Sequence, residues 1–169
     1  MGKIVFFVAL IMLFPEGCGK KSEIEQSQVQ IKQLEKEVSS YKMGDIKTQM
    51  QEWLKQAKII NGIRIVSQKV ESDDLEQLRQ IGENLRDELG KQGIGLIASI
   101  LNEKVQLVCV VTDDLMKKYP AGKIAGEAAK QIGGAGGGKP HLATAGGKDI
   151  SKLPDLLNNF ESMIEKFIS

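Results

Sequence analysis

A glycine-rich run between Gly133 and Gly147 constrains this chain more than any other feature of its sequence. It reads Gly-Gly-Ala-Gly-Gly-Gly-Lys-Pro-His-Leu-Ala-Thr-Ala-Gly-Gly and holds seven of the chain's eighteen glycines. Glycine loses more conformational entropy on folding than any other residue, so folded proteins concentrate it where a side chain does not fit. Apolar, periodic sequence bounds the run, unlike a flexible Gly/Ser linker. The run therefore predicts an ordered loop that presents its backbone.

Two explanations of the run compete. The glycines either let a ligand approach the backbone, or they pack tightly against a neighbouring strand or helix. Charge favours the ligand, because residues 115–152 carry seven lysines against two acids, whereas residues 71–90 carry seven acids against two arginines. Lysine beside exposed backbone amides is suited to phosphate. The loop is thus a candidate phosphate-binding surface with Lys139, His141 and Lys148 at its edges.

The run differs from the common nucleotide-binding loops. A P-loop requires Gly-Lys followed by Ser or Thr directly after a strand, but Pro140 follows Lys139, and a helix is expected to end near Ile132. A dinucleotide-binding fingerprint also lies between a strand and a helix. Aromatic residues make up 5% of the chain, which argues against stacking of single-stranded bases. Contact through shape and phosphates suits structured RNA better.

We predict no catalytic residue, no metal site and no cofactor. Cys18 and Cys109 lack metal-ligand spacing, and Cys109 falls in an apolar run that predicts a buried thiol. His141 is the single histidine, and a polar loop contact is the expected role for it. Asp113 and Asp114 are expected at the start of a short helix, as caps and not as ligands. The chain is therefore not expected to be an enzyme on its own.

Residues 1–21 are an apolar leader of uncertain origin. Lys3 precedes eleven apolar residues, Ile4 to Phe14, which is the outline of a signal peptide. Cys18 after Gly17 partly matches a lipoprotein cleavage site. The stretch is shorter than the ~20 apolar residues that a membrane-spanning helix needs. An export signal, a membrane anchor and a start-site artefact all stay open, and we favour the last, with a cytoplasmic location.

Residues 22–59 predict an amphipathic helical hairpin or coiled coil. Apolar residues recur every seven positions at Ile24, Ile31 and Val38, as in a coiled coil. A break at Gly44 precedes a second amphipathic helix, whose apolar positions are Ile46, Met50, Trp53, Leu54 and Ala57. A hairpin within one chain and a homodimer through residues 22–58 both fit this pattern.

Residues 60–169 predict an α+β globular unit with a small mixed sheet. The periodicity changes from that of helices to that of strands and back several times. The expected elements are a strand over 63–70, a helix over 73–90 between a Ser72 or Asp73 cap and Gly90, paired strands over 94–100 and 105–111, a short helical turn at 113–118 capped by Thr112, a helix over 121–132, the glycine loop, and a helix over 151–168 with Pro154 in its first turn.

Three stretches of the carboxyl-terminal half point to a family. Ala121-Gly-Lys-Ile-Ala-Gly, Gly133-Gly-Ala-Gly-Gly-Gly-Lys-Pro and Ala143-Thr-Ala-Gly-Gly-Lys-Asp149 closely resemble the DHH-associated domain at the carboxyl end of alanyl-tRNA synthetases. The family pattern is roughly Gly-Gly-x-Gly-Gly-Gly-Arg-Pro-x-x-Ala-x-x-Gly-Gly, followed by a final helix. The resemblance extends more weakly back to about residue 22. Lys139 stands where arginine is usual, and His141 and Thr144 also depart from the pattern.

The resemblance implies a non-catalytic module that grips the elbow of L-shaped tRNA, with alanine tRNA as the expected partner. The family's aminoacylation and editing motifs do not occur in this sequence, and a module that acts alone and one that works with a synthetase catalytic partner both stay open. An exported or membrane-tethered structural protein that keeps the fold without RNA is the competing expectation. The tRNA contacts implied by the family pattern, together with His141, are Gly136, Gly137, Gly138, Lys139, Gly146, Gly147 and Lys148.

Overall fold

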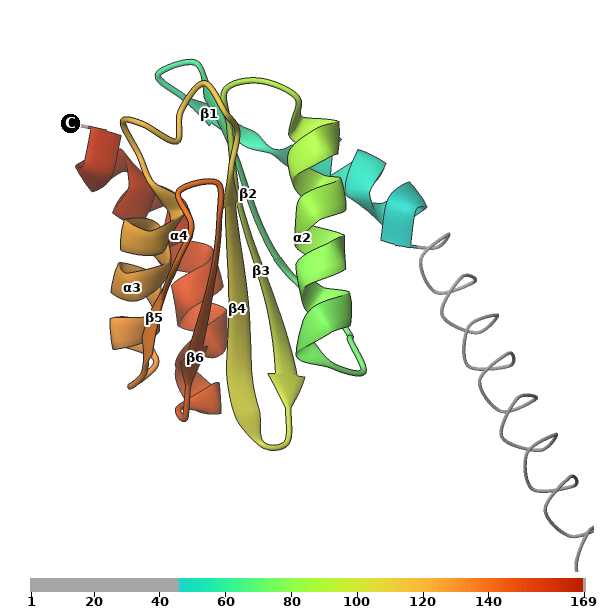
Figure 1. Ribbon diagram of the computed structural model, residues 1–169, viewed down its shortest axis with the longest axis vertical. Helices are drawn as coiled ribbons and strands as arrows, with labels where there is room; N and C mark the ends of the chain where they lie inside the picture. Colours follow the sequence, from blue (N-terminus) through green and yellow to red (C-terminus); the bar gives the residue numbers. More distant parts are fainter. Residues whose placement is uncertain (1–45, 169) are drawn as a thin grey trace, which may run out of the picture. The chain divides into compact units, whose positions relative to one another are not determined.

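A six-stranded sheet organises residues 46–168, the part of the chain that the structure, a computed structural model, describes (Figure 1). Adjacent strands of the sheet run antiparallel, except for β2 and β3, which run parallel to each other. This mixed sheet confirms the predicted α+β class. Its strands, in spatial order, are β1 (Lys58–Ile60), β2 (Ile63–Lys69), β3 (Gly93–Leu101), β4 (Lys104–Val111), β6 (Leu142–Gly147) and β5 (Ala135–Gly138).

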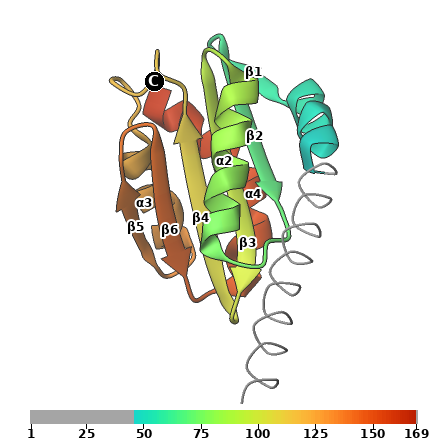
Figure 2. The same cartoon turned by 45° about the vertical axis from the view of Figure 1, so that its right-hand side comes forward.

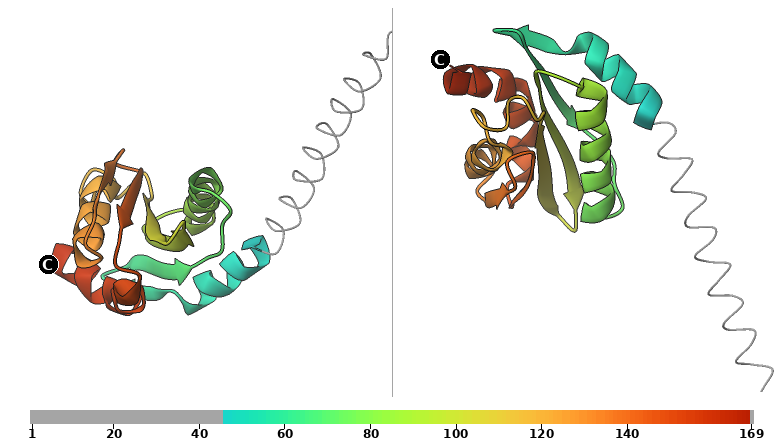
Figure 3. Two further views of the ribbon diagram at one scale, coloured as in Figure 1. Left: turned by 90° about the horizontal axis from the view of Figure 1, so that it is seen from below. Right: turned by 45° about the horizontal axis from the view of Figure 1, so that its top comes forward.

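Helices cover both faces of the sheet (Figures 2 and 3). Helix α2 (Leu75–Leu89) lies on one face, while α3 (Ala121–Gln131) and α4 (Leu153–Ile168), preceded by the 3-10 turn η1 (Ile150–Lys152), lie on the other. A further helix covers residues 46–56. None of the helices in this described region is long and apolar enough to cross a membrane.

Strand β4 shows how the two layers share the sheet. Its side chains alternate between the faces, as in any strand. Leu107 and Cys109 join the core formed with α3 and α4. Val108 and Val110 point to the opposite face, where their methyl groups lie against Gly82 of α2. Both sides of β4 are therefore buried from Leu107 to Val111, which explains why this part of its sequence is continuously apolar.

The β2–α2–β3 unit follows the predicted pattern with one correction. Helix α2 begins after Asp74, whose carboxylate accepts a hydrogen bond from Gln77 N at 2.7 Å. The predicted caps, Ser72 and Asp73, are wrong, because the Gln77 side chain instead accepts a bond from Asp73 N. Gly90 ends the helix with a φ of 68°, as predicted for a glycine at this position.

At residues 113–118, where a short helical turn was predicted, the chain turns but does not continue into a regular helix. These residues make hydrogen-bonded turns, in which Leu115 N and Met116 N both donate to Thr112 O. Pro120 follows at once and lacks a backbone donor, so a helix cannot propagate through it. Thr112 Oγ1 accepts a bond from Gly93 N at 3.0 Å, so its side chain ties this segment to β3 and caps no helix.

Strand β1 was missed by the sequence analysis. It pairs with β2 through a two-residue turn at Asn61 and Gly62, with φ values of 52° and 83°. Positive φ at both central residues is the signature of the turn type that Asn-Gly favours in hairpins. The Asn-Gly dipeptide was the available signal. Lys58 of β1 also forms an ion pair with Glu161 of α4.

The helix predicted from Ile46 onward is confirmed at 46–56, and it belongs to the same compact unit as the sheet. Met50 is its buried anchor, 1% exposed. The predicted leader at 1–21 and the coiled coil at 22–43 lie outside the described residues.

Candidate nucleic-acid interface

The glycine run is a β-hairpin and not the loop that we predicted. Its first half forms β5 and its second half forms β6, in antiparallel pairing at one side of the sheet (Figure 2). Gly136 pairs with Ala145, and Gly138 pairs with Ala143. The sequence analysis missed these strands because glycine and alanine are poor strand formers on their own, and the ladder to β4 overrides that preference.

Close packing accounts for most of these glycines. A Cβ on Gly136 would lie 2.2 Å from Ala145 Cβ, and one on Gly134 would lie 1.7 Å from Gly146 O. A Cβ on Gly147 would lie 2.4 Å from Ile132 Cγ1. These distances leave no room for a methyl group. The packing explanation therefore holds at these positions.

Helix α3 adds a second close contact, from beneath β5. Gly122 and Gly126 are one turn apart on α3, so they present the same face. A Cβ on Gly122 would lie 3.1 Å from Gly138 O, and one on Gly126 would lie 3.7 Å from Gly136 O. A glycine-faced helix thus lies directly against a glycine-rich strand, and this contact explains the first family stretch, at residues 121–126.

Gly137 is the exception among the glycines of residues 133–147. No atom of residues 46–168 outside its chain neighbours lies within 4 Å of a Cβ built on it, and its φ is not positive. Gly133, which also has open space, has a φ of 64° that favours glycine. A Cβ on Gly146 would meet the flexible end of Gln106 at 3.3 Å and Val105 O at 3.5 Å. The fold therefore does not require glycine at 137, and this residue remains available for contact with a ligand.

The open side of Gly137 faces the same way as α2. Gly137 pairs with Thr144, and Thr144 pairs with Val108, whose side chain packs on α2. Directly paired residues point to the same face of a sheet. The surface beside α2 is therefore short of side chains along β5, and every residue of β5 is exposed.

Two arginines of α2 lie toward this surface. Arg79 and Arg86 are three and four residues from Gly82, which packs on β4, so all three share one row of the helix. Their side chains are 42% and 28% exposed and pair with Glu76 and Asp87, respectively. The sequence analysis counted these arginines only in the charge balance of residues 71–90.

The predicted basic residues do not form one cluster. Lys139 and His141 lie in the turn of the hairpin, whereas Lys148 follows β6 at its other end. The six residues of β6 lie between the hairpin turn and Lys148, which corresponds to about 20 Å at the rise of a strand. A ligand in contact with both would have to follow the whole hairpin.

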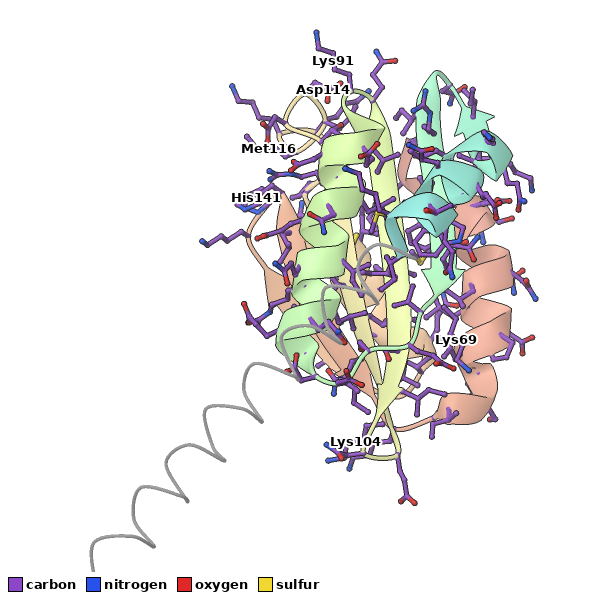
Figure 4. All side chains as sticks on the ribbon, turned by 90° about the vertical axis from the view of Figure 1, so that its right-hand side faces the viewer. Lys69, Lys91, Lys104, Asp114, Met116 and His141 are labelled. Carbon is purple, nitrogen blue, oxygen red and sulfur yellow. The ribbon has the colours of Figure 1, made fainter. Side chains whose placement is uncertain are left out.

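Backbone hydrogen bonds hold the hairpin turn in place. Ala121 N donates to Pro140 O at 2.8 Å, and Val111 N donates to His141 O at 2.9 Å. The turn is thus tied both to the start of α3 and to the end of β4. Figure 4 shows His141 at the same end of the molecule as Lys91, Asp114 and Met116.

Asp114 organises the loop beside this turn. Its carboxylate accepts a bond from Gln92 N at 2.9 Å, where Gln92 has a φ of 51°. A hydrogen bond from the Thr112 side chain lowers the pKa of Asp114, and the bond from Gln92 and the charge of Lys91 lower it further, against a smaller opposing effect of burial. Asp114 is therefore a structural anchor, and the role predicted for it as a helix cap is wrong.

The part of the chain that the structure describes holds no cluster of metal-ligating side chains. Within residues 46–168, no set of three or more His, Cys, Asp or Glu side chains lies close enough to hold an ion. Cys109 is buried, as predicted, and burial raises the pKa of its thiol far above the usual range. The chemistry offered by the surface is therefore that of cations and an exposed backbone.

A small α+β module with a glycine hairpin packed on a glycine-faced helix is the class of protein that these features define. The DHHA1 domain family matches residues 62–166, so the chain belongs to this family and the predicted resemblance is confirmed. The fold is similar to that of the C-Ala domain from Aquifex aeolicus alanyl-tRNA synthetase, with a TM-score of 0.58 and 25% identity over 66% of this chain and 96% of that one.

The curated relatives that the chain matches are much longer proteins, and the similarity covers a small part of each. The chain is 39% identical over 137 residues to the alanine–tRNA ligase of Geobacillus kaustophilus (strain HTA426), and 37% identical over 145 residues to that of Acetivibrio thermocellus. These matches cover 80% and 85% of this chain but 15% and 16% of the relatives. The chain thus corresponds to about one sixth of the length of these ligases.

Proposed function

We propose that this protein is a tRNA-binding module without catalytic activity of its own, which holds the elbow of folded tRNA on its glycine hairpin. Membership of the DHHA1 family and the likeness to alanine–tRNA ligases and to a C-Ala domain support this proposal. Alanine tRNA is the proposed partner, and the cytoplasm is the proposed location. Aminoacylation would be carried out by a synthetase catalytic domain acting together with this chain.

The observation that carries the proposal is the open side of Gly137. Because Gly137 has no side chain, a sugar–phosphate backbone can come within van der Waals distance of the main chain there. Lys139 in the adjacent turn is exposed and supplies a positive charge. Arg79 and Arg86 add two guanidinium groups on the same side of the sheet. Such contacts read the shape and phosphates of an RNA and carry little base information.

The predicted contact residues have different roles in this proposal. Gly137 and Lys139 are proposed to touch RNA, with His141 beside them. Gly136, Gly138 and Gly147 support the contact by allowing the two strands of the hairpin to pack closely against each other and against α3. Lys148 and Gly146 would reach RNA only when it extends along the whole hairpin.

Equilibrium binding of the full chain to folded alanine tRNA tests the proposal, with an unstructured RNA of the same length as the competitor. We expect a preference for folded tRNA that weakens steeply with salt, because phosphate contacts release counterions. Lys139→Glu should weaken binding, whereas Lys104→Glu, the same charge change at the opposite end of the molecule, should not. Equal affinity for both RNAs would contradict the proposal.

Lys148→Glu, measured separately, reports how far the RNA extends. Loss of affinity in Lys139→Glu alone would confine the contact to the hairpin turn and its surroundings. Similar losses in both variants would indicate an RNA that follows the hairpin over its full length.

A further inference from the structure

Five lysines from separate parts of the sequence gather at one end of the molecule. Lys91 lies in the loop before β3, Lys117 and Lys118 lie in the segment after β4, Lys123 lies in the first turn of α3, and Lys139 lies in the hairpin turn. All five side chains are exposed. We call this surface the lysine end. The sequence analysis had singled out Lys139 alone.

Sheet topology brings these segments together. Strand β3 begins, β4 ends and β6 begins at the same end of the sheet, because β3 and β6 both run antiparallel to β4. The connecting loops must therefore meet there. Figure 4 shows Lys91 and His141 at this end and Lys104 at the opposite one.

Hydrogen bonds join the loops into a fixed backbone. Thr112 N donates to Gly93 O at 3.0 Å, Gln92 N donates to the Asp114 carboxylate at 2.9 Å, and Ala121 N donates to Pro140 O at 2.8 Å. The loop before β3, the segment after β4 and the hairpin turn are thus linked in series. The backbone positions from which the lysine side chains extend are therefore fixed, and a ligand need not order the loops on binding.

Positive charge dominates the lysine end. Asp113 and Asp114 are the acids of its three loops, and the Asp114 carboxylate already accepts bonds within the fold. Asp87 and Glu88, in the last turn of α2 before Lys91, add two further negative charges beside the five lysines. At the opposite end, lysines and acids alternate closely, as in Lys69 with Glu71 and Lys104 with Glu103. The lysine end therefore carries more positive than negative charge, although the whole chain is nearly neutral.

We propose that the lysine end is a phosphate-binding surface for structured RNA, with Lys91, Lys117 and Lys118 as contacts that extend the hairpin site toward α2. This inference rests on the proposed tRNA binding. Lysine ammonium groups are compact charges on flexible stems, which suits phosphates of varied orientation better than bases. The segment after β4, which carries Lys117 and Lys118, leads into α3, and α3 is joined to the hairpin turn by the bond from Ala121 N to Pro140 O, so one RNA backbone can contact both the segment and the turn.

The slope of binding affinity against salt tests the proposal on the full chain. Glutamine keeps most of the length of the lysine side chain, which matters because the Lys118 ammonium lies 5.1 Å from the centre of the Tyr119 ring. In Lys117→Gln/Lys118→Gln, the slope of log K against log salt for folded alanine tRNA should fall in magnitude by about two. Lys69→Gln/Lys104→Gln removes the same charge from the opposite end and should leave the slope unchanged.

The outcomes separate this inference from the proposed function. If the wild-type chain binds folded tRNA and Lys139→Glu weakens it, but Lys117→Gln/Lys118→Gln leaves the slope unchanged, the lysine end is not an RNA contact and the inference alone fails. If both lysine pairs lower the slope equally, the attraction is a general effect of charge and the inference also fails. If the wild-type chain does not bind folded tRNA at low salt, both proposals fail together.

Discussion

Alanine at neighbouring glycines of β5 separates packing from binding. In Gly136→Ala the new methyl group would lie 2.2 Å from Ala145 Cβ and 2.7 Å from Ala145 Cα. Carbon atoms in favourable contact lie about 3.5–4.0 Å apart. The two strands must therefore shift, and overpacking of this kind costs about 1–3 kcal/mol.

The same methyl group at Gly137 meets no such obstacle. No atom of the described chain beyond its neighbours lies within 4 Å of the new Cβ, and the backbone conformation suits alanine. Alanine also lowers the entropy of the unfolded chain, which stabilises the fold by about 0.4–1 kcal/mol. This entropy effect is the same for alanine at either position, so the free energies of unfolding of Gly136→Ala and Gly137→Ala should differ by the cost of overpacking, about 1–3 kcal/mol.

Urea unfolding followed by circular dichroism measures this difference on the full chain. We expect Gly137→Ala to unfold at the wild-type urea concentration or above, and Gly136→Ala to unfold below it with the same dependence on urea. Binding to folded alanine tRNA, measured in the absence of urea, should weaken in Gly137→Ala although its fold is intact.

Two results would refute this reasoning. Equal destabilisation of both variants would mean that the open side of Gly137 is occupied. Unchanged tRNA affinity in a stable Gly137→Ala would mean that RNA does not approach the backbone there, and the central observation behind the proposed function would be lost.

Three further predictions concern the framework around the site. Asp74→Ala should lower the free energy of unfolding by about 1 kcal/mol, measured in urea, because Gln77 N loses its cap; an unchanged midpoint would show that Asp74 does not stabilise α2. The pKa of Asp114 is lowered in the folded state, so its contribution to the free energy of unfolding is present above the ordinary pKa of 3.8 and is lost as the pH falls through the lower folded pKa. The free energy of unfolding should therefore depend less on pH in the acid range in Asp114→Asn than in the wild-type chain. Identical pH profiles would contradict the anchoring role. The Cys109 thiol is buried and its pKa is raised, so a thiol-specific reagent should modify it only after unfolding in urea. The assay uses Cys18→Ser, in which Cys109 is the single thiol. Modification of the native chain at pH 8 would contradict the burial of Cys109.

Much of the fold could be predicted from local sequence patterns. Helix α2 has apolar residues at helical spacing and a glycine directly after its end, and both signals act within a few residues of each other. The apolar runs that became β3 and β4 were recognisable for the same reason. The prediction at residues 113–118 was in error because the local helix signals there are weak. Strand β1 was missed because the hairpin signal of Asn61-Gly62 was not used.

The glycine hairpin shows the limit of this approach. Its residues have low strand propensity, so no local signal indicates β5 and β6. Their pairing to β4 and the close approach of Gly122 on α3 make the strands stable, and these contacts join residues far apart in the sequence.

The sequence by itself determined the mixed α+β class, most of the helices and strands, and the family, because periodicity, caps and the spacing of glycines are properties of neighbouring residues. Only the tertiary structure decided which glycines are required by packing and which one is open. It also decided that Lys148 lies far from Lys139, while Lys91 and Lys117 lie in loops joined to the hairpin turn. These relations depend on strand register and sheet topology, which bring together residues that no local pattern connects.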